Sequence, residues 1–367
     1  MAHKTSGPPV KLDESCDICN APALTRPILD VNLAGVFAAH ICECDHCGFR
    51  QVRPRLSPVE LRALYSIDYF DTDTTVGFGD YARQQQRYER QAYFLAKELE
   101  RITPMGRLLE VGCALGFFLN SLRQYSAWKI MGIDVSEFAA YFAHQQFGLD
   151  VRCVTLEDAQ FPDNAFDYSL QKDLLEHVLR PRDHLLETRR VLRVGGCLQL
   201  ITPNGNADFG VIKHMSDTLQ RSSKDLLPLL GQIHLSFFSK LHLLRLFSEC
   251  GFECIRFRNI HIKSGLRALG YLPAMKKTLR AVPAGQSRDE LDLSSRIQNV
   301  MAVSDDPRTD GLVKKIRREL ATHRSRLRSW HPYFYFRRIQ EKIGAWPSFA
   351  TLGVDFGYDF EFLLRKR

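Results

Sequence analysis

The sequence predicts an α/β protein with a mostly parallel central sheet, preceded by a small cysteine-rich module. Between residues 104 and 261, short apolar runs that suit buried strands alternate with stretches that suit helices. Such alternation is typical of a parallel sheet with helices on both faces. Within residues 10–56, two Cys-x-x-Cys pairs stand close together, and pairs at this spacing are typical of zinc-binding turns.

The composition agrees with a globular protein of two domains and a smaller module. The chain has 367 residues, of which 45% are hydrophobic and 25% are charged. No run of about 18 apolar residues is present, which excludes a membrane-spanning helix. The opening residues lack the apolar segment of a secretory signal, so we expect a cytoplasmic location.

The cysteine-rich module holds the pairs Cys16/Cys19 and Cys44/Cys47. Two thiolates three residues apart on a tight turn can bind one zinc ion from the same side, and a second pair completes a tetrahedron. Because four thiolates leave no open coordination position, the sequence predicts a structural zinc ion rather than a catalytic one. Cys42 is an alternative ligand to Cys44, and the spacing alone does not decide between them.

Residues 57–103 are predicted to form a helical linker against the next domain. Ser57 and Glu60 form a capping-box pattern, which predicts a helix that runs to about Tyr65. A longer helix is expected over residues 80–101, because this stretch lacks glycine and proline and its apolar residues recur at helical spacing. The aromatic stretch between the two helices suits either a lid or a set of core anchors.

A glycine-rich turn follows the first predicted strand of the sheet. The strand ends near Glu110, the turn reads Gly-Cys-Ala-Leu-Gly over residues 112–116, and a helix is expected from Phe117. Small residues let the backbone approach a ligand closely, and the helix start offers free N–H groups. The next strand ends in Asp134, an acid that can accept hydrogen bonds from ribose hydroxyls. The turn lacks the second glycine of a dinucleotide motif, and Glu110 would be a poor neighbour for a pyrophosphate.

These residues resemble the class I S-adenosylmethionine (SAM)-dependent methyltransferases. The glycine motif of that family is E/D-x-G-x-G-x-G, and residues 110–116 match it with Ala114 in place of the middle glycine. Segments at residues 175–178, 191–196 and 234–239 resemble later family motifs in the same order. The resemblance implies a Rossmann-like sheet of seven strands, formed by residues 104–261 and completed by a last strand in residues 351–367. It also implies SAM as the cofactor, held by Glu110, Gly112, Ala114, Gly116, Asp134, Leu156, Glu157 and Gln171.

The methyl acceptor needs a group that removes its proton, most often a histidine or a carboxylate. The candidates are Glu176, His177 and His234, and a histidine near its ordinary pKa can take a proton at neutral pH. The chain lacks the Asn-Pro-Pro-Tyr motif of family members that methylate amino groups. Its whole layout resembles bacterial methyltransferases of polysaccharide and sugar pathways. That resemblance implies a hydroxyl of a sugar, a glycan precursor or a small metabolite as acceptor.

Two other functions stay open from the sequence. An RNA methyltransferase would use the zinc module and the basic residues to bind RNA, although the sequence favours a small acceptor over nucleic acid. A protein without catalytic activity would bind SAM and zinc only to interact with a partner.

Residues 262–350 form a basic insert before the last strand. Residues 263–342 hold 18 basic and 8 acidic side chains, whereas the whole chain has a net charge of only +8. The insert suits a helical cap, a surface for anionic lipid, or an RNA-binding patch. The lipid interpretation would place the cytoplasmic protein at the periphery of a membrane. The sequence does not predict the oligomeric state.

Overall fold

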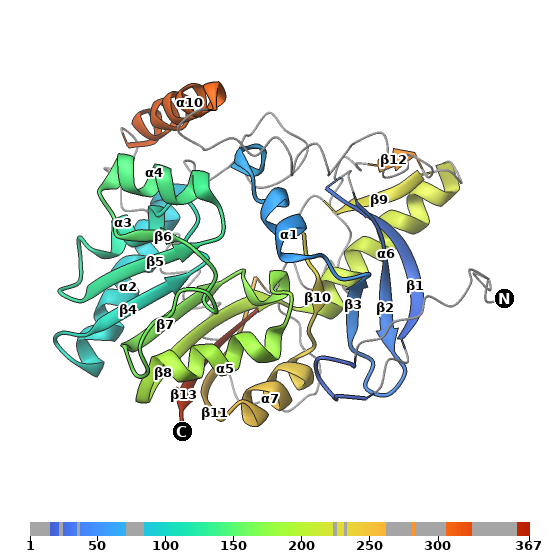
Figure 1. Cartoon of the computed structure of the whole chain (residues 1–367), viewed down its shortest axis with the longest axis horizontal. Coiled ribbons are helices and arrows are strands. Elements are labelled where there is room, and N and C mark those ends of the chain that lie inside the picture. The colour runs from blue at the N-terminus through green and yellow to red at the C-terminus, as the bar shows by residue number, and fades with distance from the viewer. Residues whose placement is uncertain are drawn as a thin grey trace.

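The computed structural model describes residues 15–21, 25–34, 37–70, 84–222, 226–230, 233–261, 281–283, 306–324 and 358–367. Two sheets lie side by side, and helices pack against both of them (Figure 1). The larger sheet belongs to the predicted α/β domain, and the smaller sheet contains the N-terminal strands.

The larger sheet has seven strands in the order β11-β13-β8-β7-β4-β5-β6. The neighbours from β8 to β6 are parallel, whereas β13 runs antiparallel to both β8 and β11. The predicted seven-stranded, mostly parallel, Rossmann-like sheet is therefore confirmed. Its strands are β4 (Arg107–Val111), β5 (Lys129–Asp134), β6 (Val151–Cys153), β7 (Phe166–Lys172), β8 (Leu192–Pro203), β11 (Phe252–Ile260) and β13 (Asp359–Lys366).

Helices cover both faces of this sheet through two separate apolar clusters. In helix α2, Tyr88, Ala92, Leu95 and Leu99 are buried at spacings of three or four residues, so its apolar stripe faces the domain core. The covering helices are α2 (Gln85–Ile102), α3 (Phe117–Leu122) and α4 (Glu137–Phe147) on one face, and α5 (Pro181–Val191) and α7 (Lys240–Glu249) on the other.

The smaller sheet has six strands in the order β10-β3-β2-β1-β9-β12. Three of them come from the N-terminal module, but β9, β10 and β12 come from far along the chain, a return that the sequence analysis did not foresee. Helices α1 and α6 contribute apolar residues to the core of this sheet. The elements are β1 (Thr25–Leu33), β2 (Phe37–Cys44), β3 (Arg50–Arg53), α1 (Pro58–Leu64), α6 (Gly205–Ser222), β9 (Leu226–Leu230), β10 (Ser236–Phe237) and β12 (Ala281–Pro283).

Helix α1 begins as the capping-box pattern predicts. The Ser57 side chain accepts a hydrogen bond from the N–H of Glu60, and the Glu60 side chain accepts one from the N–H of Ser57. The helix ends at Leu64 and a short 3-10 turn, η1 (Ile67–Phe70), follows it. Helix α1 lies between the two sheets (Figure 1).

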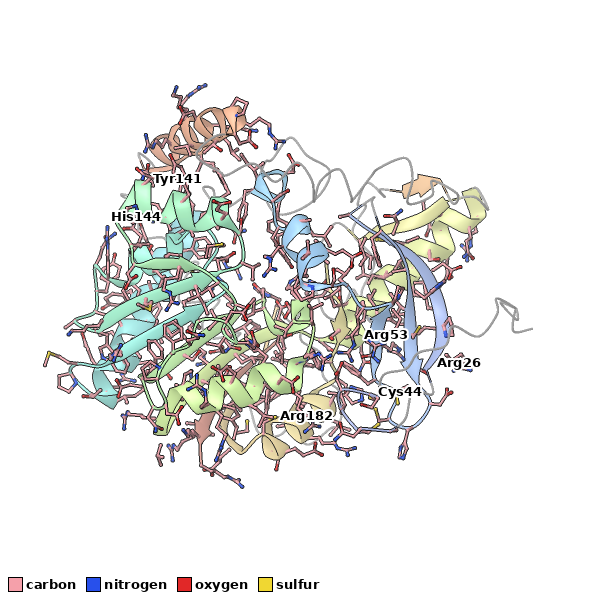
Figure 2. All side chains as sticks on the ribbon, viewed as in Figure 1. Arg26, Cys44, Arg53, Tyr141, His144 and Arg182 are labelled. Atoms are coloured by element: carbon pink, nitrogen blue, oxygen red, sulfur yellow. The ribbon has the colours of Figure 1, made fainter. Side chains whose placement is uncertain are left out.

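Part of the basic insert is a helix that packs on the larger domain. Helix α10 (Pro307–Arg324) buries Leu312, Val313 and Ile316 in the same cluster as α4, and Figure 2 shows Tyr141 on α4 next to it. Arg308 also forms an ion pair of 2.8 Å with Asp68 of η1. The described helix of the insert therefore packs on the surface of the larger domain. Apart from α10 and β12, the insert lies outside the described residues. Within the described ranges, no helix has the length and apolarity needed to span a bilayer.

Candidate active site and cysteine cluster

The glycine-rich turn joins β4 to α3 and adopts a backbone that its small residues permit. Gly112 and Gly116 have φ values of +73° and +75°, in the left-handed region that favours glycine. At Gly116 a Cβ would also lie 2.8 Å from Leu149 and 2.9 Å from Ala143. Ala114 also has a left-handed φ of +47°, and its N–H donates to Asp134 Oδ2 over 2.8 Å. This hydrogen bond offsets part of the strain, so the turn tolerates alanine in place of the middle glycine.

Two acids, buried Glu110 and half-buried Asp134, stand at the carboxyl edge of the sheet beside this turn. Asp134, at the end of β5, accepts hydrogen bonds from the N–H groups of Ala114 and Ser136 over 2.8 and 2.9 Å. Glu110, in β4, is only 3% exposed. Burial raises the pKa of Glu110 to about 8, although the charge of Lys172 opposes the shift. Among the described residues, Glu110 Oε2 has no hydrogen-bond partner, which leaves an acceptor for a cationic group.

The other predicted cofactor residues are largely engaged with the domain itself. Leu156 is buried. Glu157 and Gln171 both contact His184 of α5, with Glu157 Oε1 2.9 Å from Nδ1 and Gln171 Oε1 3.2 Å from Nε2. Gln171 also donates to Thr188 over 2.9 Å and is fully buried within β7. These contacts tie Gln171 to α5, so they do not favour the predicted contact with the methionine part of SAM.

The structure brings together the three predicted acid–base residues. Glu176 and His177 lie in a short 3-10 turn, η3 (Leu175–His177), and His234 lies just before β10. One carboxylate oxygen of Glu176 and one ring nitrogen of each histidine lie within 4.8 Å of one another. The two imidazole rings meet edge to face, with 4.9 Å between their centroids. A hydrogen bond of 2.8 Å from the N–H of Leu235 to the carbonyl oxygen of Glu176 holds the two segments together.

Each histidine of this cluster is oriented through its Nδ1 atom. His177 Nδ1 lies 2.5 Å from the carbonyl oxygen of Ile233 and 2.9 Å from the hydroxyl of Tyr65. Because a carbonyl only accepts, His177 Nδ1 carries a proton and the lone pair of the neutral ring is on Nε2. His234 Nδ1 lies 2.7 Å from Asp208 Oδ2 and donates to that carboxylate.

Glu176 is held through one of its two oxygens. Its Oε2 accepts a hydrogen bond from the Thr202 hydroxyl over 2.9 Å. Its Oε1 lies 3.7 Å from His177 Nε2 and, in the part of the chain that the structure describes, has no hydrogen-bond partner. The Glu176 residue is only 1% exposed. Solvent therefore does not satisfy the free oxygen.

Local electrostatics moves the pKa values of all three groups away from their ordinary values. Burial raises the pKa of Glu176 to about 8 and lowers that of His177 to about 3. Burial would also lower the pKa of His234, but the Asp208 carboxylate outweighs it and raises this pKa to about 9. The sequence reasoning assumes a histidine near its ordinary pKa, and this assumption is wrong for both rings. At neutral pH His177 is neutral and His234 is charged.

Sequence reasoning missed two residues of this site, Asp208 and Tyr65. Asp208 lies in the first turn of α6, a helix that the sequence analysis did not predict. For Tyr65 the sequence predicts only the end of a helix, and in the structure this residue is the C-cap of α1. An acid in the first turn of a helix that directly follows a sheet strand is a signal that could have pointed to Asp208.

The four predicted zinc ligands form a cluster of their own. The Sγ atoms of Cys16, Cys19, Cys44 and Cys47 lie within 4.8 Å of one another. The Cys16–Cys47 and Cys19–Cys44 pairs are 3.6 and 3.8 Å apart. With Zn–S bonds of about 2.3 Å a tetrahedron has edges of about 3.8 Å, so the four thiols fit a zinc ion. Cys42 is buried in β2 and does not belong to the cluster, whereas Cys44 does.

The cysteine cluster is anchored to the α/β domain. His242 Nε2 in α7 lies 3.0 Å from the carbonyl oxygen of Cys47, and Arg182 in α5 donates to the carbonyl oxygen of Ile18 over 3.0 Å. Figure 2 shows Cys44 at the end of β2 that lies toward Arg182. Residues of both cysteine pairs pack in the same apolar cluster as residues of α5 and α7. The cysteine turns and the sheet domain therefore share one core.

The central part of the chain matches a known domain family. Residues 109–200 match the family model described as "Methyltransferase domain". An uncharacterized protein of Methanocaldococcus jannaschii is 26% identical over 49% of this chain and 82% of that protein. Ubiquinone biosynthesis O-methyltransferase of Parvibaculum lavamentivorans is 30% identical over 27% of this chain and 40% of that protein. tRNA U34 carboxymethyltransferase of Cellvibrio japonicus is 32% identical over 33% of this chain and 38% of that protein. The chain thus spans less than half of these two relatives with a named activity.

Solved structures of similar proteins include a cyclase and a methyltransferase. The [4+2]-cyclase SpnF is 19% identical, with a TM-score of 0.40 over 76% of this chain and 81% of that one. Geranyl diphosphate methyltransferase in complex with SAM is 16% identical, with a TM-score of 0.40 over 79% of this chain and 90% of that one. The family match itself runs from β4 into β8 and so includes the glycine-rich turn and Asp134. Residues 109–200 therefore match a methyltransferase domain, and the larger sheet has the α/β fold of the class I methyltransferases.

Proposed function

We propose that the protein transfers the methyl group of SAM to a hydroxyl oxygen of a sugar, a glycan precursor or a small metabolite. The observation that carries this proposal is the buried cluster of Glu176, His177 and His234 near the predicted SAM-binding residues. Both groups lie at the carboxyl edge of the larger sheet, because Glu176 and His177 follow β7 and Asp134 ends β5. A hydroxyl must lose its proton as the methyl group arrives, and the cluster offers the proton-binding groups for that step.

The glycine-rich turn and the acids Glu110 and Asp134 would hold the cofactor. The free Oε2 of Glu110 suits the ammonium group of SAM, because a charge-assisted hydrogen bond would satisfy it. Asp134 would accept hydrogen bonds from the ribose hydroxyls. When bound, SAM supplies an electrophilic methyl group on its sulfonium. The chain itself has to hold the acceptor oxygen in line with the S–CH3 bond and accept its proton.

The neutral His177 and the free oxygen of Glu176 are the atoms available to the acceptor hydroxyl. His177 Nε2 has a lone pair because its Nδ1–H points to the Ile233 carbonyl. Tyr65 contacts His177, and its ring packs at a tilt of 58° against that of Tyr69, with 4.9 Å between the two ring centroids. These aromatic side chains would exclude water from the acceptor oxygen and so protect the reacting groups.

We also propose that the cysteine cluster holds a structural zinc ion. Four thiolates would complete the tetrahedral coordination and leave no position for a substrate. The ion would fix the two cysteine turns against α5 and α7, through the contacts of Ile18 and Cys47 with Arg182 and His242.

The class of acceptor rests on the resemblance of the chain's layout to sugar-pathway enzymes. The names of the relatives cover different pathways, among them ubiquinone biosynthesis and tRNA modification. We favour a small hydroxyl acceptor over RNA because α10, the described helix of the basic insert, is tied to the domain by its apolar face and by Arg308.

Methyl transfer from radiolabelled SAM into a host extract tests the proposal. The product is divided into RNase-treated, protease-treated and lipid-extracted portions. We expect label that survives RNase and separates with glycans, lipid-linked sugars or small molecules. Label that RNase removes would overturn the proposed acceptor and favour an RNA methyltransferase.

Two variants then test the acid–base cluster. His177→Ala and His234→Ala are expected to abolish turnover while SAM binding, measured by calorimetry, is kept. The matched control is His144→Ala, which removes an exposed histidine on α4, outside the cluster (Figure 2). A wild-type protein that binds SAM but transfers no methyl group in any extract would favour the non-catalytic alternative.

A further inference from the structure

The three side chains of the Glu176–His177–His234 cluster have fixed orientations. In each of the three side chains, a hydrogen bond fixes one polar atom. The other polar atom is Nε2 in each histidine and Oε1 in Glu176, and within the described residues no hydrogen bond of this kind fixes it. The fixing groups are the Ile233 carbonyl for His177, the Asp208 carboxylate for His234 and the Thr202 hydroxyl for Glu176.

This arrangement is the one that metal ligands need. Imidazole rings that bind a metal donate their other N–H to a carbonyl or carboxylate, and ligating carboxylates are themselves hydrogen-bonded. We infer that Glu176, His177 and His234 bind a divalent transition-metal cation through Glu176 Oε1 and the Nε2 atoms of the two histidines, with the ion displacing the Nε2 proton of the charged His234. The binding of the ion stands on its own, and only its catalytic role rests on the proposed function.

The ligand set itself indicates the class of ion. Two imidazoles and one carboxylate suit zinc, iron(II) or a related first-row cation, whereas calcium and magnesium prefer oxygen ligands. Three protein ligands also leave at least one coordination position open, as catalytic sites do. The cysteine cluster differs on both points, because its ligands are thiolates and four of them leave no open coordination position.

The free oxygen of Glu176 is an independent sign of a missing partner. Glu176 is 1% exposed, and Oε1 has no hydrogen-bond partner within the described residues. A buried acceptor without a partner is costly, and a cation between Glu176 and the two imidazoles would remove that cost.

The spacing requires a small inward movement. The three ligand atoms lie within 4.8 Å of one another, whereas ligands at about 2.1 Å from a tetrahedral ion lie about 3.4 Å apart. Ion binding would therefore draw the side chains together by rotation about their terminal bonds. Asp208 and Thr202 would stay in contact with the outer atoms.

An ion there would take up the lone pairs of His177 Nε2 and Glu176 Oε1, so it would replace them in ionising the acceptor. A hydroxyl oxygen bound to the open position would have a lowered pKa, because the cation would stabilise the oxyanion. The O–H proton would pass to solvent as the acceptor binds, the oxygen would form a bond to the methyl carbon, and the S–CH3 bond would break with its electron pair on sulfur. The products are the methyl ether and the neutral thioether of the cofactor.

Cobalt(II) binding to the whole chain tests the inference without measuring activity. The protein as purified, with its cysteine cluster filled, is dialysed against cobalt(II), and bound metal is counted and followed by visible absorption. We expect one cobalt ion per chain, with the spectrum of nitrogen and oxygen ligands. Glu176→Gln and His234→Ala should lose this ion, and His40→Ala, a half-exposed histidine outside the cluster, should keep it.

A graded variant separates a metal site from a merely structural cluster. Asp208→Asn keeps the shape of the side chain but weakens its hold on His234, so cobalt affinity should fall about 10- to 100-fold. Unchanged affinity in Asp208→Asn, or cobalt bound equally by Glu176→Gln and the wild type, would overturn the inference. A wild type that binds no cobalt yet methylates its acceptor would overturn it too and leave the proposed function standing. Cobalt binding without methyl transfer would support the site and count against the proposed function.

Discussion

Replacing Glu110 by glutamine gives the sharpest test of the cofactor side of the site. Burial raises the pKa of Glu110 from 4.5 to about 8, against the opposing charge of Lys172. A carboxyl with a raised folded-state pKa contributes stability that is fully present below its unfolded pKa and is lost as pH rises through the folded pKa. The wild type should therefore lose stability from Glu110 between about pH 4.5 and pH 8. Glutamine is neutral throughout this range.

The magnitude follows from the width of that window. Each pH unit inside it is worth about 1.4 kcal/mol, so between pH 5 and pH 7 the free energy of unfolding of Glu110→Gln should gain about 3 kcal/mol on the wild type. Urea unfolding of both proteins without SAM, at the two pH values, measures this difference. The gain is an upper value, because Lys172 can rearrange to meet the carboxylate.

The same variant should bind SAM more weakly. Its amide cannot offer the negative charge that the ammonium group of SAM would meet, and a hydrogen bond to a charged group is worth about 1.5–3 kcal/mol, or about 10-fold or more in affinity. Calorimetric titration with SAM measures this change. Parallel pH profiles of unfolding in the two proteins would refute the account of a buried, unpartnered carboxyl. Equal SAM affinities would refute its role toward the cofactor.

Three further predictions concern other parts of the chain. Cys44→Ser should lower the zinc content by about one ion per chain, whereas Cys42→Ser should keep it; equal loss in metal analysis would contradict the assigned ligands. Gly205→Ala would place a Cβ 2.2 Å from the backbone carbon of Phe237, so we expect a loss of stability of about 3 kcal/mol in urea unfolding, and a loss under about 1 kcal/mol would be too small for this contact. Asp134→Asn should weaken SAM binding by about 10-fold or more while zinc content stays unchanged; calorimetry with SAM would show unaltered affinity if the acid has no part in the site.

Much of the larger domain could be predicted from local patterns. The helix start at Ser57, the turn over residues 112–116 and the strand that ends at Asp134 all depend on neighbouring residues, and each appears within a few residues of its expected place. The order of the motifs then gave the sheet. The pairing of β9 and β10 with the N-terminal strands could not be predicted in this way, because it depends on contacts between segments nearly 200 residues apart.

The candidate site shows the same division. The sequence supplied Glu176, His177 and His234 as separate candidates, but nothing in it showed that they meet. Their pKa values also could not be predicted, since the shifts come from burial and from Asp208, which lies on a helix absent from the sequence analysis. The pKa of a histidine depends on the burial and the charged neighbours that the fold gives it, and these cannot be read from the sequence.

The pairing of β3 with β10 in the smaller sheet connects the cysteine cluster to the rest of the protein. Strand β3 follows the second cysteine pair directly and pairs with β10, with Gln51 opposite Ser236. The N–H of Val52 donates to the carbonyl oxygen of Leu235 over 2.8 Å. His234 is the residue just before, so the cysteine turns, β3 and β10 form one continuous connection to the acid–base cluster. A zinc ion at the cysteines would then fix the strand that positions His234, and a structural ion would act on catalysis through the backbone alone.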